Sequence, residues 1–301
     1  MTAPRILLLG ADGQVGWELR RALLPLGEVV PTTRAQADLS DLDPTGLRAL
    51  LARERPQVIV NAAAYTAVDK AEAEPALAQR INAEAPQVLA EYAAAQGAWL
   101  LHYSTDYVFD GTKPGAYTER DAPNPQSAYG RSKLAGEQAI AASGCRHLIL
   151  RTSWVYAARG GNFAKTMLRL AAERDSLRVV ADQFGAPTSA ELIADVSAHA
   201  LHHALHAPGG TSCSGLYHLS AQGSTSWHGY AQHVLAQAAA RGMALRCTPD
   251  AVQPIATADY PLPAPRPANS RLDCSKLQTT FGLHLPPWQT QVQRLIDELP
   301  H

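Results

Sequence analysis

Residues 5–16 read RILLLGADGQVG, an apolar run that stops at a glycine and leads into a helical pattern from residue 15. Glycines at positions 10, 13 and 16 permit a tight turn and a close approach of the backbone to a pyrophosphate, which binds at the positive end of a helix. The alternative is a glycine-rich strand-to-helix turn without a ligand. Because the loop follows the first expected strand, the pattern favours a dinucleotide site that includes Gly10, Gly13 and Gly16.

The first half of the chain alternates short apolar runs with helical patterns. The runs are mostly uninterrupted, as expected for strands of a parallel sheet that helices cover on both faces. The expected strands are 5–9, 29–32, 57–60, 98–103 and 147–150, and the expected helices are 15–24, 42–53, 75–95 and 127–142. Right-handed crossovers between such strands predict an α/β protein with a doubly wound (Rossmann) parallel sheet.

Beyond about residue 152 the alternation loosens. The expected helices in this part are 162–174, 190–206 and 227–241. The proline-rich segment 249–267 cannot be a regular helix or a central strand, so we expect an ordered loop or a lid. The pattern predicts a dinucleotide-binding domain over residues 1–152 and a smaller α/β, mainly substrate-binding domain over 153–301, with helix 190–206 returning to pack on the Rossmann sheet.

The bulk composition excludes several classes of function. The 301 residues are 46% hydrophobic and 18% charged, which is enough for a sizeable core. A formal net charge of -1 gives no basic surface for nucleic acid, and four widely spaced cysteines form no metal or redox motif. The apolar run near the start is too short for a signal peptide or a membrane span. We expect a cytoplasmic protein with no nucleic-acid partner and no membrane contact.

A second stretch, SAYGRSKLAGE at 127–137, places Tyr129 and Lys133 four residues apart in an expected helix. Residues at this spacing are neighbours on one helical face. They could be a surface pair with the ring on the lysine stem, and the spacing Y-x-x-x-K occurs by chance in many helices. The functional hypothesis is a phenol whose pKa the ammonium lowers, so that the phenol exchanges a proton near neutral pH.

The end of the second expected strand carries no carboxylate to bind the adenosine ribose of NAD. Thr33 and Arg34 stand there and could contact the 2′-phosphate of NADP, although Arg34 could equally be solvated. Asp38 and Leu39 follow and are candidates for contact with the adenine ring. The cofactor is therefore expected to be NADPH or NADH, with NADP favoured.

The order of four short motifs resembles that of the extended short-chain dehydrogenase/reductases. These motifs are Gly10-x-x-Gly13-x-x-Gly16, Asn61-Ala-Ala-Ala64, Ser104-Thr105 and Tyr129-x-x-x-Lys133. Longer segments are similar to the dTDP-4-dehydrorhamnose reductases, and they run over nearly the whole chain. These segments are NAAAYTAVDKAE (61–72), HYSTDYVFDG (102–111), RTSWVY (151–156), DQFGAPT (182–188) and RPANSRLD (266–273).

The resemblance implies a reaction in which hydride from NADPH or NADH reduces the C4 ketone of dTDP-4-dehydro-L-rhamnose to dTDP-L-rhamnose. It implies that Tyr129 donates a proton to the new alkoxide and that Lys133 holds the nicotinamide ribose and keeps the phenol acidic. It also implies that Thr105 hydrogen-bonds the carbonyl oxygen. Free tyrosine titrates at about pH 10, so a phenol needs such help to exchange protons at neutral pH.

The same resemblance implies the remaining contacts. The cofactor contacts are Gly13, Gln14 and Val15 at the pyrophosphate and Ala63, Ala64, Tyr65, Thr66 and Tyr103 at the nicotinamide half. The substrate contacts are Thr66, Val68, Ser104, Thr105, Asp106, Tyr129 and Trp154. Without the resemblance, Trp154 would be a core aromatic and Asp106 a turn or cap residue. Arg266 either faces the diphosphate, since guanidinium binds oxygens in pairs, or is a solvated loop arginine.

Acidic and histidine clusters suggest further sites. Some reductases of the family hold a divalent cation with glutamates at a dimer contact, so the resemblance implies an Mg²⁺ site in a homodimer at Glu18, Glu191 and Glu298; each could also be an ordinary surface acid. Histidines at helical spacing could form a metal-binding face, but no nearby acid completes it; they are His199, His202, His203 and His206. Three acids are expected on a solvated helix edge: Asp69, Glu72 and Glu74.

Two other functions remain open. A nucleotide-sugar epimerase or dehydratase on the same scaffold would keep its NAD bound, and a dehydratase would have an acid pair after the threonine, whereas Thr105 is followed by Asp106-Tyr107. A non-catalytic NADP-binding regulatory subunit, such as the methionine adenosyltransferase beta subunit, need not keep Thr105, Tyr129 and Lys133 together. The intact set favours a reductase that acts on a dTDP-sugar, and it leaves the exact sugar open.

Overall fold

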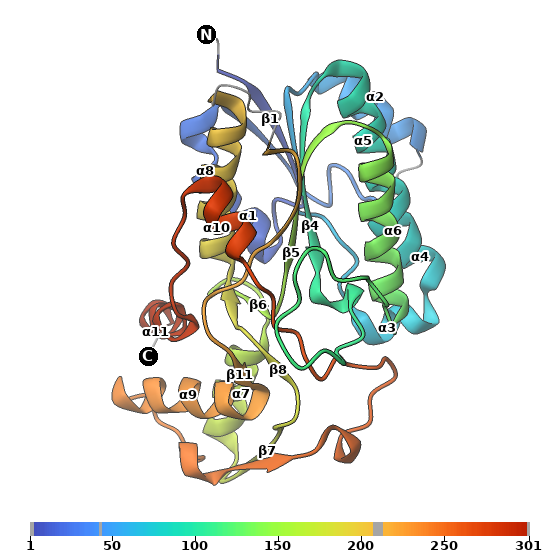
Figure 1. Ribbon diagram of the computed structural model, residues 1–301. Helices are drawn as coiled ribbons and strands as arrows, with labels where there is room; N and C mark the ends of the chain where they lie inside the picture. The colour runs from blue at the N-terminus through green and yellow to red at the C-terminus, as the bar shows by residue number, and fades with distance from the viewer. Residues whose placement is uncertain (1–2, 42–43, 207–212, 300–301) are drawn as a thin grey trace.

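A six-stranded parallel sheet forms the centre of the molecule in the computed structural model, which describes residues 3–41, 44–206 and 213–299 (Figure 1). The strand order is β2-β1-β3-β4-β5-β10, and every neighbouring pair is parallel. The strands are β1(Arg5–Leu9), β2(Glu28–Thr32), β3(Val58–Asn61), β4(Trp99–Thr105), β5(Arg146–Thr152) and β10(Gly215–His218). The order reverses between β1 and β3, so the expected doubly wound α/β sheet is confirmed.

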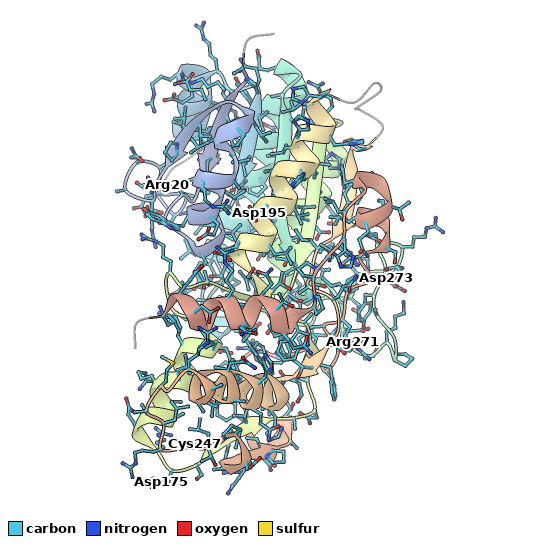
Figure 2. All side chains as sticks on the ribbon, turned by 90° about the vertical axis from the view of Figure 1, so that its left-hand side faces the viewer. Arg20, Asp175, Asp195, Cys247, Arg271 and Asp273 are labelled. Atoms are coloured by element: carbon cyan, nitrogen blue, oxygen red, sulfur yellow. The ribbon has the colours of Figure 1, made fainter. Side chains whose placement is uncertain are left out.

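Helices cover both faces of the sheet. One layer contains α1(Gln14–Ala22) and α8(Ala190–His206), which pack together, and the other contains α2(Pro44–Glu54), α5(Ala85–Gln96) and α6(Ala128–Ala142). Successive strand residues point to opposite faces, so Ile6 and Leu8 join the α8 cluster while Leu7 and Leu9 join the α5 cluster. Figure 2 looks onto the face of α1 and α8. No helix in the described part of the chain is long and apolar enough to cross a membrane.

The single helix expected over residues 75–95 is interrupted. α4(Pro75–Gln79) is followed by a π-helical turn, Arg80–Glu84, and α5 begins after it. Pro86 has no N–H, and its ring crowds the carbonyl of Asn82 four residues earlier, which explains why the helix widens there. The widened turn brings the Asn82 carbonyl against α6 at Gly136, where any Cβ would overlap the oxygen. The break therefore permits a close approach between this turn and α6.

The C-terminal part extends beyond the carboxyl ends of the strands (Figure 1). Its elements are β6(Val155–Tyr156), α7(Phe163–Glu173), β7(Leu177–Val180), β8(Phe184–Gly185), β9(Thr188–Ser189), β11(Thr225–Ser226), α9(Trp227–Ala240), β12(Val252–Ile255) and α11(Trp288–Glu298), with α10(Ser275–Phe281) packed on β10. Three two-stranded sheets pair β6 with β9, β7 with β12 and β8 with β11. The segment 249–267 contains β12 in one of these small sheets, so the expectation that it is no regular helix or central strand is confirmed.

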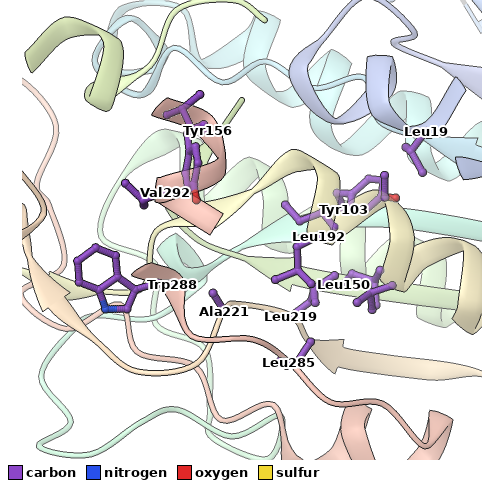
Figure 3. Close-up of a cluster of buried hydrophobic side chains, with 14 of the residues drawn as sticks. Leu19, Tyr103, Leu150, Tyr156, Leu192, Leu219, Ala221, Leu285, Trp288 and Val292 are labelled. Atoms are coloured by element: carbon purple, nitrogen blue, oxygen red, sulfur yellow. The ribbon is translucent and has the colours of Figure 1, made fainter. Parts of the chain in front are cut away.

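One hydrophobic cluster joins the central sheet to the C-terminal part (Figure 3). It contains Leu150 of β5, Leu192 of α8 and Trp288 of α11, all nearly inaccessible to solvent. α8, the helix expected to return to the sheet, packs against α1. The boundary at residue 152 stays a prediction, and a continuous core crosses it.

Candidate active site

The glycine loop joins β1 to α1 with glycines where a side chain does not fit. Gly10 has a φ of 75°, and a Cβ on it would lie 2.6 Å from the Ala63 nitrogen. A Cβ on Gly16 would overlap the Gly10 carbonyl. Gly13 is different, because a Cβ there would meet no atom closer than 3.4 Å. Gly10 and Gly16 therefore set the path of the loop, and Gly13 leaves open space at the start of α1.

The amino-terminal end of α1 has the features of a phosphate site. Gly13 is the N-cap and offers no capping side chain, so the first-turn amides have no side-chain acceptor at the cap. The segment before α7 lies over this end: Asn162 donates to the Gln14 side chain at 3.2 Å, and Arg159 reaches the Asp12 carbonyl at 3.5 Å. Arg159 is a cation beside the loop that the sequence interpretation did not include.

α6 carries the tyrosine and the lysine on one buried face. Ser127 caps the helix by accepting a backbone amide hydrogen bond. Tyr129 and Lys133 are 9% and 2% exposed, so the surface-pair alternative is wrong. One turn further, Glu137 makes a two-point ion pair with Arg151 of β5, at 2.9 and 2.6 Å, and both side chains are buried. This pair fastens the face of α6 that carries Tyr129 and Lys133 to the sheet.

The expected lowering of the Tyr129 pKa is wrong. Burial raises the pKa of the phenol to about 12, and a side-chain hydrogen bond with Thr105 lowers it only in part. Lys133 does not offset the burial, because its side-chain nitrogen is turned to the Tyr103 carbonyl oxygen at 2.6 Å. The phenol therefore holds its proton firmly at neutral pH.

The side-chain nitrogen of Lys133 has two partners on β4. It donates to the Tyr103 carbonyl and lies 3.3 Å from Nε2 of His102. His102 is 1% exposed, and its Nδ1 lies 3.1 Å from Nδ2 of Asn61 on the neighbouring strand. Burial lowers the pKa of Lys133 to about 8, although the charge of Glu137 acts in the opposite direction.

The carboxyl end of β4 brings a hydroxyl and a carboxyl group close to the phenol. Thr105 Oγ1 donates to Asp106 Oδ1 at 3.0 Å. Burial raises the pKa of the Asp106 carboxyl to about 6, against hydrogen bonds from Ser270 and Thr105. The hydroxyls of Ser104 and of Thr152 on β5 are buried and have no hydrogen-bond partner within the described residues. Such atoms are uncommon in protein interiors.

Asn82 ties the loop after β3 to α6. Its Oδ1 accepts from the Tyr65 amide at 2.9 Å, and its Nδ2 donates to the Tyr65 carbonyl and to Ser132 Oγ, both at 3.0 Å. The Tyr65 hydroxyl donates to Glu74 at 2.5 Å. Three other predicted contacts in this region are half-buried: Ala63, Ala64 and Val68, the first residue of α3(Val68–Ala73). Thr66 is exposed.

The Tyr103 ring lies in the cluster of Figure 3 and in a different cluster from Tyr129. Its hydroxyl hydrogen-bonds Ser197 of α8 at 2.7 Å, and burial raises its pKa. Its backbone carbonyl, rather than its ring, contacts Lys133. The contact of Tyr103 with the nicotinamide half stays a prediction. Only the backbone carbonyl of Tyr103, and not its ring, is hydrogen-bonded to Lys133 in the described residues.

Trp154 belongs to an aromatic stack that the sequence did not predict. Its φ is 48°, a left-handed conformation that is rare for a bulky residue and common at functional sites. Its half-buried ring stacks on Trp227 of α9 with centroids 3.6 Å apart. A Cβ on Gly185 would lie 2.6 Å from the Trp154 ring, so a glycine is needed opposite the stack.

Arg266 is paired rather than solvated. It donates to Asp69 of α3 at 2.7 Å, and the Ala264 amide donates to the same carboxylate at 3.2 Å. Two neighbouring acids also have partners: Glu72 accepts from the first amide of α6 at 2.7 Å, and Glu74 accepts from a tyrosine hydroxyl. The interpretation as a solvated helix edge fits Glu74, which is exposed, whereas Asp69 and Glu72 are half-buried. The hydrogen bonds of the three acids also fasten the proline-rich loop, α6 and the loop after β3.

The residues expected at the adenosine form an exposed loop that is hydrogen-bonded to itself. Arg34 donates to Asp38 at 2.8 Å, and Ser40 donates to the same carboxylate at 2.6 Å. These hydrogen bonds, first from Ser40 and then from Arg34, lower the pKa of Asp38 to about 2. Thr33 also hydrogen-bonds within this loop. The Leu39 side chain is 5% exposed and packs in the core, so only its edge or backbone is free to meet an adenine ring.

The three glutamates expected at a metal lie on α1, α8 and α11. Arg294 is 2.8 Å from Glu191 and 3.1 Å from Glu298, and Glu18 lies 3.8 Å from Arg21. Burial raises the pKa of Glu18 and of Glu191, and the charge of Glu298 adds to both shifts. The described residues contain no group of three or more acids, histidines or cysteines arranged for a metal. The interfacial site stays a prediction about a dimer.

Several residues of the site carry no role in the sequence interpretation. Five of them appeared only within quoted segments: Asn61, His102, Glu137, Arg151 and Thr152. Asn82 and Trp227 were not singled out at all. Glu137 could have been found, because it follows Lys133 by one helical turn on the face of Tyr129. The others lack a local signal, since their partners are far apart in the sequence.

Several known proteins are similar to this chain in sequence and in fold over almost their full lengths. The family described as RmlD substrate binding domain matches residues 4–300. The dTDP-4-dehydrorhamnose reductase of Escherichia coli strain K12 is 51% identical over 298 residues, which cover 98% of this chain and 97% of that protein. The same enzyme of Salmonella typhimurium is 50% identical over 296 residues, with 98% and 97% covered. The crystal structure of dTDP-4-dehydrorhamnose reductase from Bacillus anthracis in complex with NADP has a TM-score of 0.89 at 34% identity and covers 99% of this chain and 100% of that chain. The resemblance of the motifs is confirmed, and the chain belongs to the RmlD substrate binding domain family.

Proposed function

We propose that the chain reduces the C4 ketone of dTDP-4-dehydro-L-rhamnose to dTDP-L-rhamnose with hydride from NADPH or NADH. The observation that carries the proposal is the set of Thr105, Tyr129 and Lys133: a buried phenol hydrogen-bonded to a hydroxyl, with a buried lysine one helical turn away. The substrate is assigned from the reductases of Escherichia coli and Salmonella typhimurium, which share about half of the sequence.

Tyr129 supplies the proton in this reaction, while the nicotinamide supplies the hydride to the carbonyl carbon. The raised pKa of the phenol suits this direction, because the proton stays on Tyr129 until an alkoxide, a stronger base than phenolate, develops beside it. The Thr105 hydroxyl, which donates to Asp106 at 3.0 Å, turns to the developing oxyanion. The phenolate is then reprotonated from solvent.

The residues of the glycine loop fit a dinucleotide. The open space at Gly13 and the uncapped end of α1 accept a pyrophosphate, with Gln14, Val15 and Gly16 offering amides. Arg159 adds a positive charge beside the loop. Lys133 is placed to hold ribose hydroxyls, since its nitrogen lies at the carboxyl end of β4.

The substrate is proposed to lie against Asp106, Trp154 and the unpartnered hydroxyl of Ser104. Trp154 offers an aromatic face, supported from behind by Trp227. Arg266 can bind the diphosphate by exchanging the Asp69 carboxylate for phosphate oxygens of the same charge sign. Substrate binding would then loosen the link between the proline-rich loop and α3.

The direct test measures NADPH and NADH oxidation with a small panel of dTDP-4-keto-6-deoxy sugars. We expect turnover that requires added reduced cofactor and is fastest with dTDP-4-dehydro-L-rhamnose. Protein that carries tightly bound NAD and turns over a nucleotide sugar without added reductant would identify an epimerase or dehydratase instead. Protein that binds NADP and reduces none of the sugars would identify a regulatory subunit.

The homodimer and its magnesium site also belong to the proposal. The Glu18, Glu191 and Glu298 carboxylates gather beside Arg294, and a partner subunit would add to their negative charge. We expect Mg²⁺ to raise the melting temperature and to favour the dimer in analytical ultracentrifugation. Identical melting and sedimentation in EDTA and in Mg²⁺ would reject the site without affecting the assigned reaction.

A further inference from the structure

The buried contacts of Asn61, His102 and Lys133 restrict where protons can be. Asn61 Oδ1 accepts from the Ala63 amide at 3.2 Å, which fixes the orientation of the side-chain amide. Nδ2 of Asn61 therefore faces His102 and must donate to its Nδ1, 3.1 Å away. Because Nδ1 accepts this bond, the proton of a neutral His102 ring lies on Nε2.

The Nε2 proton of His102 points at the side-chain nitrogen of Lys133, 3.3 Å away. An ammonium group has three N–H donors and no acceptor, so it cannot accept this proton. A neutral amine has one lone pair, which accepts from Nε2, and two N–H bonds, one of which donates to the Tyr103 carbonyl at 2.6 Å. Only the neutral amine satisfies every hydrogen bond in the chain from Ala63 to Tyr103.

The arrangements with a charged lysine each leave two donors face to face. If His102 carries its proton on Nδ1, the Asn61 amide must turn its oxygen to the ring, and its NH₂ then meets the Ala63 amide. If His102 is an imidazolium, both ring nitrogens meet donors. His102 is 1% exposed and Lys133 2% exposed, so water is not available to relieve these conflicts.

We infer that Asn61 and His102 are positioning residues that favour the uncharged amine of Lys133 in the cofactor-free protein and couple its protonation to the contact between Asn61 and Ala63. Lys133 gains a proton only when the Asn61 amide turns and releases the Ala63 amide. Ala63 lies in the loop that is proposed to meet the nicotinamide half, so cofactor binding there would change the charge of Lys133. The catalytic part of this inference rests on the proposed function.

The pKa shift of Lys133 has the direction that this inference requires, because burial favours the uncharged amine. Burial lowers the pKa of Lys133 to about 8, and burial together with Lys133 keeps the pKa of His102 well below its usual range. Glu137, one turn further along α6, favours the charged lysine. Its carboxylate is already paired with Arg151 at 2.6 Å, which limits this influence. Tyr129 is the remaining titratable residue on this face of α6, and it keeps its proton.

The first experiment determines the tautomer of His102 by ¹⁵N NMR of cofactor-free protein labelled at histidine. We expect the signature of a neutral ring protonated on Nε2 above about pH 8, where the Lys133 amine is mainly uncharged. The signal is assigned by its loss in His102→Gln, and His147→Gln, which removes a half-buried histidine on β5 that hydrogen-bonds the Cys145 carbonyl, serves as the matched control. A ring protonated on Nδ1, or on both nitrogens, would overturn the inference.

The second experiment follows the ¹³Cε signal of Lys133 against pH, with Lys133→Met for assignment. In His102→Gln the amide oxygen can replace Nε2 with an acceptor, so we expect the Lys133 midpoint to rise by roughly one pH unit. His147→Gln should leave it unchanged. An unchanged Lys133 midpoint in His102→Gln would contradict the coupling. A lower midpoint would also contradict it, because it would mean that His102 favours the charged lysine.

The third experiment compares the pH dependence of kcat/KM for ketone reduction in wild type, His102→Gln and His147→Gln. The limb that reports Lys133 should move in the same direction as the NMR midpoint in His102→Gln alone, whereas a purely structural role would lower activity at every pH. Wild-type protein without reductase activity would reject the proposed function, while the two NMR measurements would still decide the inference about His102.

Discussion

Lys133 and Arg34 are basic residues proposed to meet opposite ends of one cofactor, and their surroundings differ. Lys133 is 2% exposed, and its side-chain nitrogen lies within hydrogen-bond distance of a carbonyl and an imidazole. The Arg34 side chain is 77% exposed and pairs with Asp38 in solvent. In the buried region every lost partner leaves a group that water cannot reach, whereas in the exposed region water and salt replace a lost partner. The same kind of change should therefore have a large effect at the catalytic end and a small one at the adenosine end.

The strongest test of the catalytic end is Tyr129→Phe, which removes one oxygen. We expect kcat for ketone reduction to fall by roughly 10²- to 10⁴-fold, because the phenol is the proposed proton donor to the alkoxide. Cofactor affinity should change little, since the ring and its packing against Tyr107, with centroids 5.6 Å apart, remain. NADPH oxidation and cofactor-fluorescence titration measure the two quantities. Reduction at the wild-type rate would remove Tyr129 from its assigned role.

The buried ion pair of Glu137 and Arg151 extends the comparison of buried and exposed charges to protein stability. In Glu137→Gln the Arg151 guanidinium, 3% exposed, loses its countercharge. We expect a loss of about 3–5 kcal/mol in the free energy of unfolding, measured by urea denaturation. The matched control is Glu173→Gln, which breaks an exposed pair with Arg169 and should cost less than about 1 kcal/mol. An equal loss of unfolding free energy in the two variants would mean that burial does not set the difference between these two ion pairs.

Much of the fold could be predicted from the sequence, because its signals are local. The apolar runs give β1 with its exact bounds and place β2, β3, β4 and β5 within a few residues, whereas β10 was not predicted. The helical spacing of Tyr129 and Lys133 put them on one face, and the structure buries that face. The helix over residues 75–95 was predicted without its break, although Pro86 carried a signal for it.

The rest of the site depends on contacts that no local pattern reports. The partner of Arg266 is Asp69, and the partner of Trp154 is Trp227, each distant in the sequence. The direction of the Tyr129 pKa shift was missed because it is set by burial, which exceeds the influence of neighbouring groups. Spacing can place two side chains on one face, but it does not say which atoms they turn to.

A substitution of Asp106 tests whether the ionised, buried carboxylate lowers the free energy of unfolding at neutral pH. Burial raises the pKa of its carboxyl to about 6, above its value of about 3.9 in an unfolded chain. The folded state therefore binds the proton more tightly, and the stability that this gives is complete below about pH 4 and lost as the pH rises through about 6. Asp106→Asn should raise the free energy of unfolding by about 1–3 kcal/mol at pH 7.5 and change it little near pH 4. Thermal melts at the two pH values measure this difference, and a destabilised variant at pH 7.5 would contradict it.

The smallest effect is expected at the adenosine end, where Arg34→Ala removes an exposed cation. If Arg34 meets the 2′-phosphate of NADP, KM for NADPH should rise roughly 3- to 10-fold while KM for NADH stays the same, because only NADPH carries that phosphate. The variant also frees Asp38, whose repulsion of the phosphate adds to the loss. Asp38→Asn is the matched variant: it releases Arg34 from its partner and should lower KM for NADPH. If Arg34→Ala raised the KM values for NADPH and NADH equally, the arginine would support the fold of the loop and would not select between the two cofactors. The adenosine end would then differ from the buried end in its solvent exposure and not through recognition of the 2′-phosphate.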